Sequence, residues 1–221
     1  MKAEFDQYAG DYCRLLEEAL PSTERAEYFS TYKVDLLAQR VQHQSVAAVL
    51  DFGCGTGRSI PYLAKAFPEA TIYGFDPSEE CLKLAESRSN ALFESEIERL
   101  PKGHFDIILA ANVFHHVSVD ERPAVLKTCA SLLADEGRIA LFEHNPFNPL
   151  TRWVFERCVF DRDAQMLPMS EAKNLAKNAG LTVSFNAYTL FVPPSLRRLR
   201  FIERALGRLP LGAQYYVEIS K

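Results

Sequence analysis

The sequence is poor in the features that stabilise small secreted proteins or anchor proteins in membranes. Its five cysteines are odd in number, are scattered along 221 residues and never form a C-x-x-C pair. This usage argues against a disulfide framework or a zinc knuckle and predicts a reducing compartment. No apolar run approaches the roughly 20 residues that cross a bilayer, and the first residues lack the apolar stretch of a secretion signal. We therefore expect a cytoplasmic protein.

An excess of positive charge is also missing. Lys and Arg number 25 against 29 Asp and Glu, so the formal net charge is −4. The whole chain therefore lacks the positive field that non-specific nucleic-acid binding needs, and no nucleic-acid partner is expected. Internal repeats and low-complexity tracts are absent as well, and this length suits one compact domain better than two.

Apolar spacing changes along the chain from helical to strand-like. Residues 15–20 and 32–41 show helical spacing, whereas from residue 46 short apolar runs alternate with helix-like stretches. Such alternation is typical of an α/β fold, a doubly wound, mostly parallel sheet with helices on both faces. The expected strands cover 46–52, 71–75, 91–93, 105–110, 137–142, 181–191 and 213–220, and the expected helices cover 58–67, 78–88, 120–134, 150–160 and 170–179.

We expect these elements to form a single domain over residues 1–221. Its predicted parts are an N-terminal helical cap (1–44), a core (45–143), an insertion (144–168) and a C-terminal part (169–221). The insertion is predicted because the prolines that follow His144 prevent a simple continuation of strand or helix. Ser170 and Gly180 carry the start and stop signals of the helix that follows it.

The most informative segment is Val49–Gly57, a strand that runs into a glycine-rich turn and then a helix. Glycines at such a turn let a ligand approach the backbone closely. The third glycine comes one residue too early for a dinucleotide motif, and the carboxylate of Asp51 would repel a pyrophosphate. Asp76 ends the second strand, where a ribose diol would be held. Together these residues favour a positively charged nucleoside ligand.

The motif D-x-G-x-G-x-G, followed by Asp76, resembles the class I S-adenosylmethionine (SAM)-dependent methyltransferases. The segments beginning at Glu98, Phe105 and Asn112 agree with that superfamily in order and spacing, and the likeness spans about residues 45–145. The resemblance implies methyl transfer, SAM as cofactor and a seven-stranded sheet with a C-terminal antiparallel strand. It implies that the cofactor-binding residues are Asp51, Gly53, Cys54, Gly55, Asp76, Pro77, Glu96, Ile97 and Asn112.

Within that set, the resemblance assigns the methionine end of the cofactor to the glycine turn, the ribose to Asp76 and the adenine to residues 96–97. Glu94 or Glu98 could replace Glu96 in that role, and Glu96 has a second interpretation as a solvated acid. Asp76 could instead cap the next helix, although Ser78 is the better candidate for the cap. Cys54 is interpreted as a packed thiol rather than a nucleophile.

Three histidines are candidate catalytic residues. His115, His116 and His144 follow the fourth and fifth predicted strands, whose carboxyl ends open onto the crevice where such sheets bind ligands. A neutral imidazole could take the proton of an acceptor hydroxyl, whereas a packed or capping histidine is the alternative. Glu143 and His144 are adjacent, and a carboxylate beside an imidazole can fix its tautomer or bind a metal. Adjacent residues on a strand point to opposite faces, however, which argues against a direct contact. No metal site is predicted.

The substrate is expected to be a small or lipid-linked molecule. Oxygen is the favoured acceptor over carbon or nitrogen, and no Asn-Pro-Pro-Tyr motif supports methylation of a nucleic-acid amine. Residues 195–208 are rich in arginine and leucine, which predicts peripheral contact with the inner face of a membrane. The alternative is a packed helix with solvated arginines. Two other functions are weighed, an NAD-dependent oxidoreductase and a non-catalytic cofactor-binding scaffold.

The predicted cap offers two further candidates. Phe5, Tyr8 and Tyr12 recur at helical spacing and could cover the cofactor, with core packing as the alternative. Lys33 could meet the carboxylate of the cofactor, with a solvated lysine as the alternative.

Overall fold

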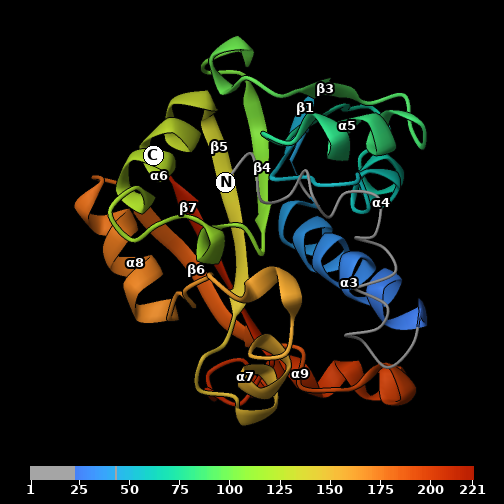
Figure 1. The fold of residues 1–221 in the computed structure, drawn as a ribbon, viewed down its shortest axis with the longest axis vertical. Helices are drawn as coiled ribbons and strands as arrows, with labels where there is room; N and C mark the ends of the chain where they lie inside the picture. Colours follow the sequence, from blue (N-terminus) through green and yellow to red (C-terminus); the bar gives the residue numbers. More distant parts are fainter. Residues whose placement is uncertain (1–22, 43) are drawn as a thin grey trace.

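One seven-stranded sheet forms the centre of the computed structural model, which describes residues 23–42 and 44–221 (Figure 1). The strands are β1 (Ala48–Phe52), β2 (Thr71–Phe75), β3 (Leu92–Glu94), β4 (Phe105–Ala111), β5 (Leu133–His144), β6 (Thr182–Thr189) and β7 (Gln214–Ser220). The α-helices are α3 (Thr23–Val41), α4 (Ile60–Ala66), α5 (Glu79–Glu86), α6 (Arg122–Leu132), α7 (Pro149–Phe155), α8 (Met169–Asn178) and α9 (Glu203–Leu206). Short 3-10 helices are η1 (Ile97–Arg99), η2 (Phe114–His116), η3 (Val159–Asp161) and η4 (Pro194–Ile202).

The strand order is β3-β2-β1-β4-β5-β7-β6. The first five strands of the chain pair in parallel, whereas β7 pairs antiparallel with both β5 and β6. The predicted fold class, a mostly parallel seven-stranded sheet with a C-terminal antiparallel strand, is confirmed. Because β1 and β4 are neighbours at the point where the strand order reverses, their carboxyl ends form the crevice in which such sheets bind ligands.

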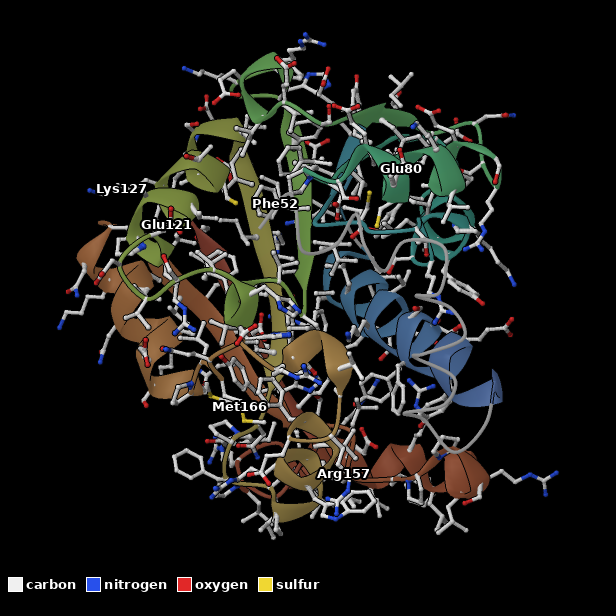
Figure 2. All side chains as sticks on the ribbon, viewed as in Figure 1. Phe52, Glu80, Glu121, Lys127, Arg157 and Met166 are labelled. Atoms are coloured by element: carbon white, nitrogen blue, oxygen red, sulfur yellow. The ribbon has the colours of Figure 1, made fainter. Side chains whose placement is uncertain are left out.

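Helices cover both faces of the sheet, and successive residues of β1 reach opposite layers. Leu50 belongs to an apolar cluster with Leu126 of α6, whereas Val49 belongs to a second cluster with Leu37 of α3. In Figure 1, α3 and α4 lie on one side of the sheet and α6 and α8 on the other. Figure 2 shows Phe52 within the sheet and Lys127 at the outer surface of α6, and their burial agrees. These two layers explain the near-continuous apolar runs of the central strands.

Several element boundaries differ from the prediction, and those of β5 and α8 have a clear physical reason. β5 begins at Leu133 rather than 137, and its pairing with β4 shifts register between Phe105 and Ile107. A Cβ on Gly137 would lie 2.5 Å from the carbonyl oxygen of Phe105, so glycine permits this close approach. α8 begins at Met169, and the expectation that Ser170 starts this helix is wrong because Pro168 occupies the N-cap.

Several of the sequence-based expectations stay predictions. The helix expected over 15–20 and the aromatic residues Phe5, Tyr8 and Tyr12 lie outside the described residues. The division into cap, core, insertion and C-terminal part stays a prediction. Over the described ranges, no helix has both the length and the apolar character that crossing a membrane requires.

Candidate functional site

The glycine-rich turn after β1 is open on one side and tightly packed on the other. Gly53 and Gly55 have φ angles of +73° and +53°, in the left-handed region that favours glycine. A Cβ on Gly53 would lie 2.5 Å from Cγ2 of Val113, so the turn lies directly against the segment after β4. Among the described residues, nothing lies within 4 Å of a Cβ built on Gly55. The backbone at Gly55 is therefore accessible to a ligand.

Asp76 at the end of β2 is bound to this turn. Its Oδ2 accepts a hydrogen bond from the Gly55 amide at 2.8 Å, and its Oδ1 accepts one from the Ser78 amide at 2.9 Å. The N-cap of α5 is Ser78, whose Oγ accepts from the Cys81 amide at 3.2 Å, as the sequence predicted. Asp76 thus lies beside the accessible Gly55 backbone, and its role toward a ribose stays a prediction.

Asp51 and Lys33 carry opposite charges in the buried region below the turn. Asp51 is 3% exposed and Lys33 is 6% exposed, so the interpretation of Lys33 as a solvated lysine is wrong. Burial raises the pKa of Asp51 to about 7, although the charge of Lys33 opposes the shift. Burial lowers the pKa of Lys33 to about 8, although the carboxylates of Glu143 and Asp51 oppose it. Lys33 therefore links the glycine turn electrostatically to Glu143.

The predicted adenine region lies after β3. Glu96 is exposed and its Oε1 is 3.0 Å from Nη2 of Arg99, as expected for a solvated acid. Glu94 is less exposed, and its Oε1 accepts hydrogen bonds from the amides of Ser95 and Glu96. Ile97 is half-buried and packs against the core. Glu94 therefore organises the backbone of this loop, and a contact of residues 96–97 with adenine stays a prediction.

The three remaining cofactor candidates are Cys54, Pro77 and Asn112. Cys54 is buried, and burial raises the pKa of its thiol well above the ordinary value, which agrees with the packed-thiol interpretation. Asn112 has a φ of +60°, and its Oδ1 accepts a hydrogen bond from Nε2 of Gln214 on β7. Asn112 thus turns the chain after β4, while Pro77 follows Asp76 at the start of the α5 cap.

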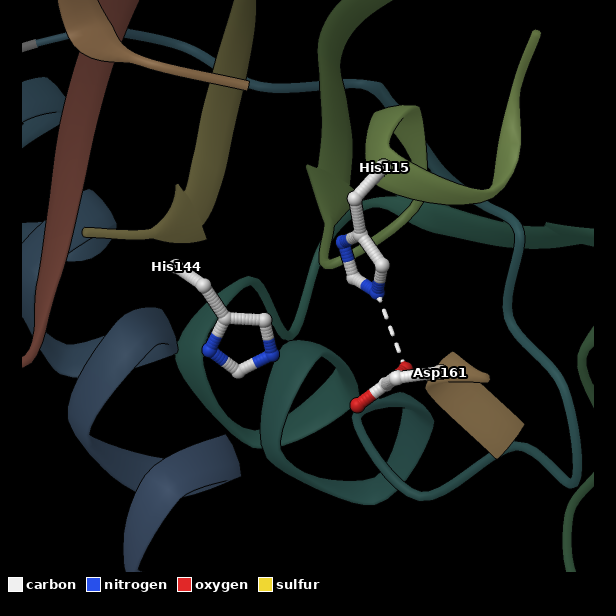
Figure 3. Close-up of side chains that lie close together, drawn as sticks. All are labelled: His115, His144 and Asp161. Carbon is white, nitrogen blue, oxygen red and sulfur yellow. Dashed lines mark ion pairs between the residues drawn. The ribbon is translucent and has the colours of Figure 1, made fainter. Parts of the chain in front are cut away.

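The three candidate histidines lie together beyond the carboxyl ends of β4 and β5. The ring centroid of His115 is 4.1 Å from that of His116 and 5.1 Å from that of His144. Nδ1 of His115 is 2.6 Å from Oε2 of Glu143, and Nε2 of His115 is 3.4 Å from Oδ1 of Asp161 (Figure 3). We call these five side chains (His115, His116, Glu143, His144 and Asp161) the histidine cluster.

Glu143 holds the cluster in place. Its Oε1 accepts hydrogen bonds from the amides of Val113 and Phe114 at 2.9 and 2.7 Å, while Oε2 contacts His115. Its ion-pair partner is His115 rather than His144, in agreement with the opposite directions of adjacent strand residues. Because Val113 also packs on Gly53, Glu143 connects the histidine cluster to the cofactor turn.

The charges within the cluster are unequal. Burial would lower the pKa of His115, but the carboxylates of Glu143 and Asp161 outweigh it and raise this pKa to about 9. Burial and the charge of His115 lower the pKa values of His116 and His144 to about 4. His115 is therefore a cation between two carboxylates, and its two neighbours are neutral imidazoles.

Two residues that build the histidine cluster escaped the sequence analysis. Asp161 lies in η3, within the predicted insertion, where neither periodicity nor a motif singles it out. Arg122 is fully buried, and its Nε donates to the carbonyls of Phe114 and Val117 while its Nη2 donates to that of Gln165. Arg122 thereby connects η2 to the segment around Gln165. The Arg-Pro pair at the start of a helix gave no sign of that role.

Comparison with known proteins shows a methyltransferase domain in this chain. A family model described as a methyltransferase domain matches residues 49–137. The chain is 23% identical over 180 residues to an uncharacterized methyltransferase from Bacillus pumilus, covering 75% of this chain and 83% of that protein. It is 27% identical over 135 residues to a malonyl-[acyl-carrier protein] O-methyltransferase from Bacillus anthracis, covering 52% of this chain and 45% of that protein.

A solved structure shares the fold. The plantazolicin methyltransferase BpumL, in complex with SAH, has a TM-score of 0.68 and 18% sequence identity, covering 100% of this chain and 95% of that chain. The site geometry fits such a cofactor, because the accessible backbone of Gly55 is flanked by carboxylates, which suit the cationic sulfonium of SAM better than a phosphorylated ligand. The domain match over residues 49–137, the curated relatives and the shared fold together identify a SAM-dependent methyltransferase domain in this chain.

Proposed function

We propose that this enzyme transfers the methyl group of SAM to an oxygen of a small or lipid-linked molecule. The observation that carries the proposal is the position of the histidine cluster, at the carboxyl ends of β4 and β5 and in contact with the glycine turn through Val113. SAM supplies an electrophilic methyl group, so the protein has to align the acceptor, exclude water and provide for the acceptor's proton.

The histidine cluster suits an acceptor hydroxyl, because its neutral imidazoles can accept the hydroxyl proton. In the proposed reaction, the hydroxyl proton passes to an imidazole nitrogen of His116 or His144. The oxygen forms a bond to the methyl carbon, and the carbon–sulfur bond breaks with its electron pair left on sulfur. The products are the methylated acceptor, neutral S-adenosylhomocysteine and a protonated imidazole. The carboxylates of Glu143 and Asp161 balance the positive charge of the protonated imidazole. Both carboxylates contact His115, and Asp161 also lies 3.5 Å from Nε2 of His116.

A lipid-linked acceptor is supported by the apolar surface near the cluster. Leu150 and Trp153 of α7 are 67% and 52% exposed, and α7 lies at the end of the sheet toward which β4 and β5 point (Figure 1). The ring of Phe155, also on α7, is 5.6 Å from that of His115. One helix therefore joins the histidine cluster to an exposed apolar surface.

The proposal is tested with SAM labelled on its methyl group and a cell extract, separated after reaction into aqueous and organic phases. We expect label in the organic phase, attached to oxygen when the product is analysed by mass spectrometry. His144→Ala should reduce the incorporation at least tenfold, whereas His104→Ala, which changes an exposed histidine packed beside Tyr73, should leave it unchanged. Label on nitrogen or carbon would contradict the choice of acceptor, and no labelled product would favour a cofactor-binding scaffold.

A further inference from the structure

We propose that His115, His144 and Asp161 form a binding site for a divalent first-row transition-metal ion. Each residue offers one ligand atom, and these atoms all lie within 4.8 Å of one another. Figure 3 shows that the three side chains converge, with Nε2 of His115 facing Asp161. Since metal–ligand distances of about 2.0–2.2 Å place the ligand atoms of one ion roughly 3–4 Å apart, small side-chain rotations complete the site.

The second observation is the way in which Glu143 orients His115. Imidazole ligands almost always bind a carboxylate or carbonyl through the ring nitrogen that does not bind the metal. Here Nδ1 of His115 is 2.6 Å from Oε2 of Glu143, which leaves Nε2 facing the proposed ion. Glu143 is itself fixed by two backbone amides, so the direction of the His115 ring is set before any ion binds.

The charge of the site provides the third observation. Glu143 is fully buried and the side chain of Asp161 is 11% exposed, so two carboxylates lie together in a region of low water access. Protonated His115 lies between them as a compensating cation, and an ion bound at Nε2 of His115 would take the place of that proton and its charge. His116 adds a third imidazole, with Nε2 at 3.5 Å from the same Oδ1 of Asp161. His144 and Asp161 are half-buried, so two of the three proposed ligands are partly exposed.

The ligand atoms restrict the kind of ion. Two imidazole nitrogens and one carboxylate oxygen suit Zn²⁺, Co²⁺, Mn²⁺ or Fe²⁺, whereas Mg²⁺ and Ca²⁺ prefer sites built from oxygen. Three protein ligands leave a coordination position open, as in catalytic rather than structural sites. The expectation from the sequence was that the chain has no metal site, since Asp161 and His144 come together only in the fold.

The role of the ion rests on the proposed function. A hydroxyl bound at the open position would pass its proton to His116, the imidazole that is not a ligand, more readily than without the ion, because the ion stabilises the oxygen anion. That oxygen would then form the bond to the methyl carbon as the carbon–sulfur bond breaks. Ion binding itself depends on the histidine cluster alone, so the two proposals can fail separately.

The test measures binding of Zn²⁺ and Co²⁺ to the purified full chain at pH 7.5, by equilibrium dialysis and by the visible absorption of bound Co²⁺. We expect one ion per chain and no competition from Mg²⁺. Asp161→Asn and His144→Gln should each weaken binding at least tenfold. Glu143→Gln, which keeps all three ligands, should weaken it by roughly 10- to 100-fold. The matched control is His104→Gln, which should leave binding unchanged, and circular dichroism confirms that each variant is folded.

Three results would overturn the metal site. They are retention of no ion after dialysis, unchanged binding in the double variant His144→Gln/Asp161→Asn, and a near-ultraviolet thiolate-to-Co²⁺ band, which would place the ion at a cysteine. Methyl transfer to oxygen by protein that holds no ion would overturn the proposed role of the ion and leave the proposed function intact. Ion binding by the cluster without methyl transfer to oxygen would support the site and contradict the proposed function.

Discussion

Asp51 is a carboxyl group whose charge depends on pH near neutrality. Its burial raises its pKa to about 7, so it is partly protonated in the free protein at pH 7. If Asp51 meets the cationic end of SAM, as the family resemblance implies, the bound cofactor favours the ionised form. The affinity for SAM should then rise by up to about tenfold between pH 6 and pH 8 and become constant above that range.

Isothermal titration calorimetry at several pH values checks this prediction. Near pH 7 the measured enthalpy should also vary with the ionisation enthalpy of the buffer, because cofactor binding releases the proton of Asp51. An affinity that stays constant from pH 6 to pH 8 would show that Asp51 does not ionise on binding. Asp51→Asn is the informative variant, since it should weaken binding and remove the pH dependence.

Lys33 affects the same titration from the opposite side. Its positive charge lowers the pKa of Asp51, so Lys33→Met should move the midpoint of the pH profile for SAM binding to a higher pH. Lys65→Met provides the control, because Lys65 is an exposed residue in the last turn of α4. A midpoint that moves to lower pH, or equally in both variants, would contradict the proposed electrostatic link.

Among the helices, α5 and α8 allow the capping rule to be tested within one molecule. Ser78 is buried and caps α5, whereas Ser170 is exposed and lies inside the first turn of α8 after the N-cap Pro168. Ser78→Ala should lower the free energy of unfolding by about 1 kcal/mol, and Ser170→Ala should change it by less than about 0.5 kcal/mol. Urea denaturation measures both values. A larger loss for Ser170→Ala would mean that the cap assignment is wrong.

Sequence patterns predicted which elements exist more reliably than where they end. Strand β2 has the predicted bounds. Its residues, Gly74 included, pair with neighbouring strands, and the turn residues Asp76 and Pro77 follow directly after its end. β5 starts earlier than predicted because Leu133 pairs with Phe105 of β4. This pairing extends the strand over residues 134–136, which show no apolar pattern. The end of a strand depends on its neighbour, and the neighbour is not visible in the local sequence.

The basic segment over residues 195–208 illustrates the same limit. Its spacing of leucines suggested one amphipathic stretch, whereas the chain forms η4 with a non-helical Leu196 and then the short α9. Part of it packs on α3, since Arg200 lies 4.4 Å from the ring of Tyr32 and 3.6 Å from Asp35. Glu203 is buried there and bonds to Tyr32 and to the amide of Val192. The packed-helix alternative therefore holds for one side of this segment.

At the scale of the whole molecule, exposed apolar and basic side chains favour contact with an anionic surface despite the net charge of −4. Phe201 is 72% exposed, Arg198 and Arg208 are also exposed, and η4 lies at the same end of the molecule as α7 (Figure 1). We predict co-sedimentation with vesicles that contain anionic lipid, weakened by salt because charge contributes to it. Phe201→Ser should reduce this binding several-fold.

The control for vesicle binding is Leu92→Ser, which changes an exposed apolar residue on β3, away from α7 and η4. It should bind vesicles as the unchanged protein does. Equal recovery with neutral and anionic lipid, or equal losses in both variants, would count against a membrane contact through this segment.

The sequence by itself determined the fold class and the cofactor. Both depend on local patterns: apolar runs that alternate with amphipathic helices specify a parallel sheet, and glycines between two strand-end acids specify a turn for a cationic nucleoside. Only the tertiary structure decided how the histidine cluster is assembled. His115, Glu143 and Asp161 lie on different elements, and packing across the sheet brings them within contact distance. Burial, which sets the charges of Asp51 and Lys33, is likewise a property of the folded chain.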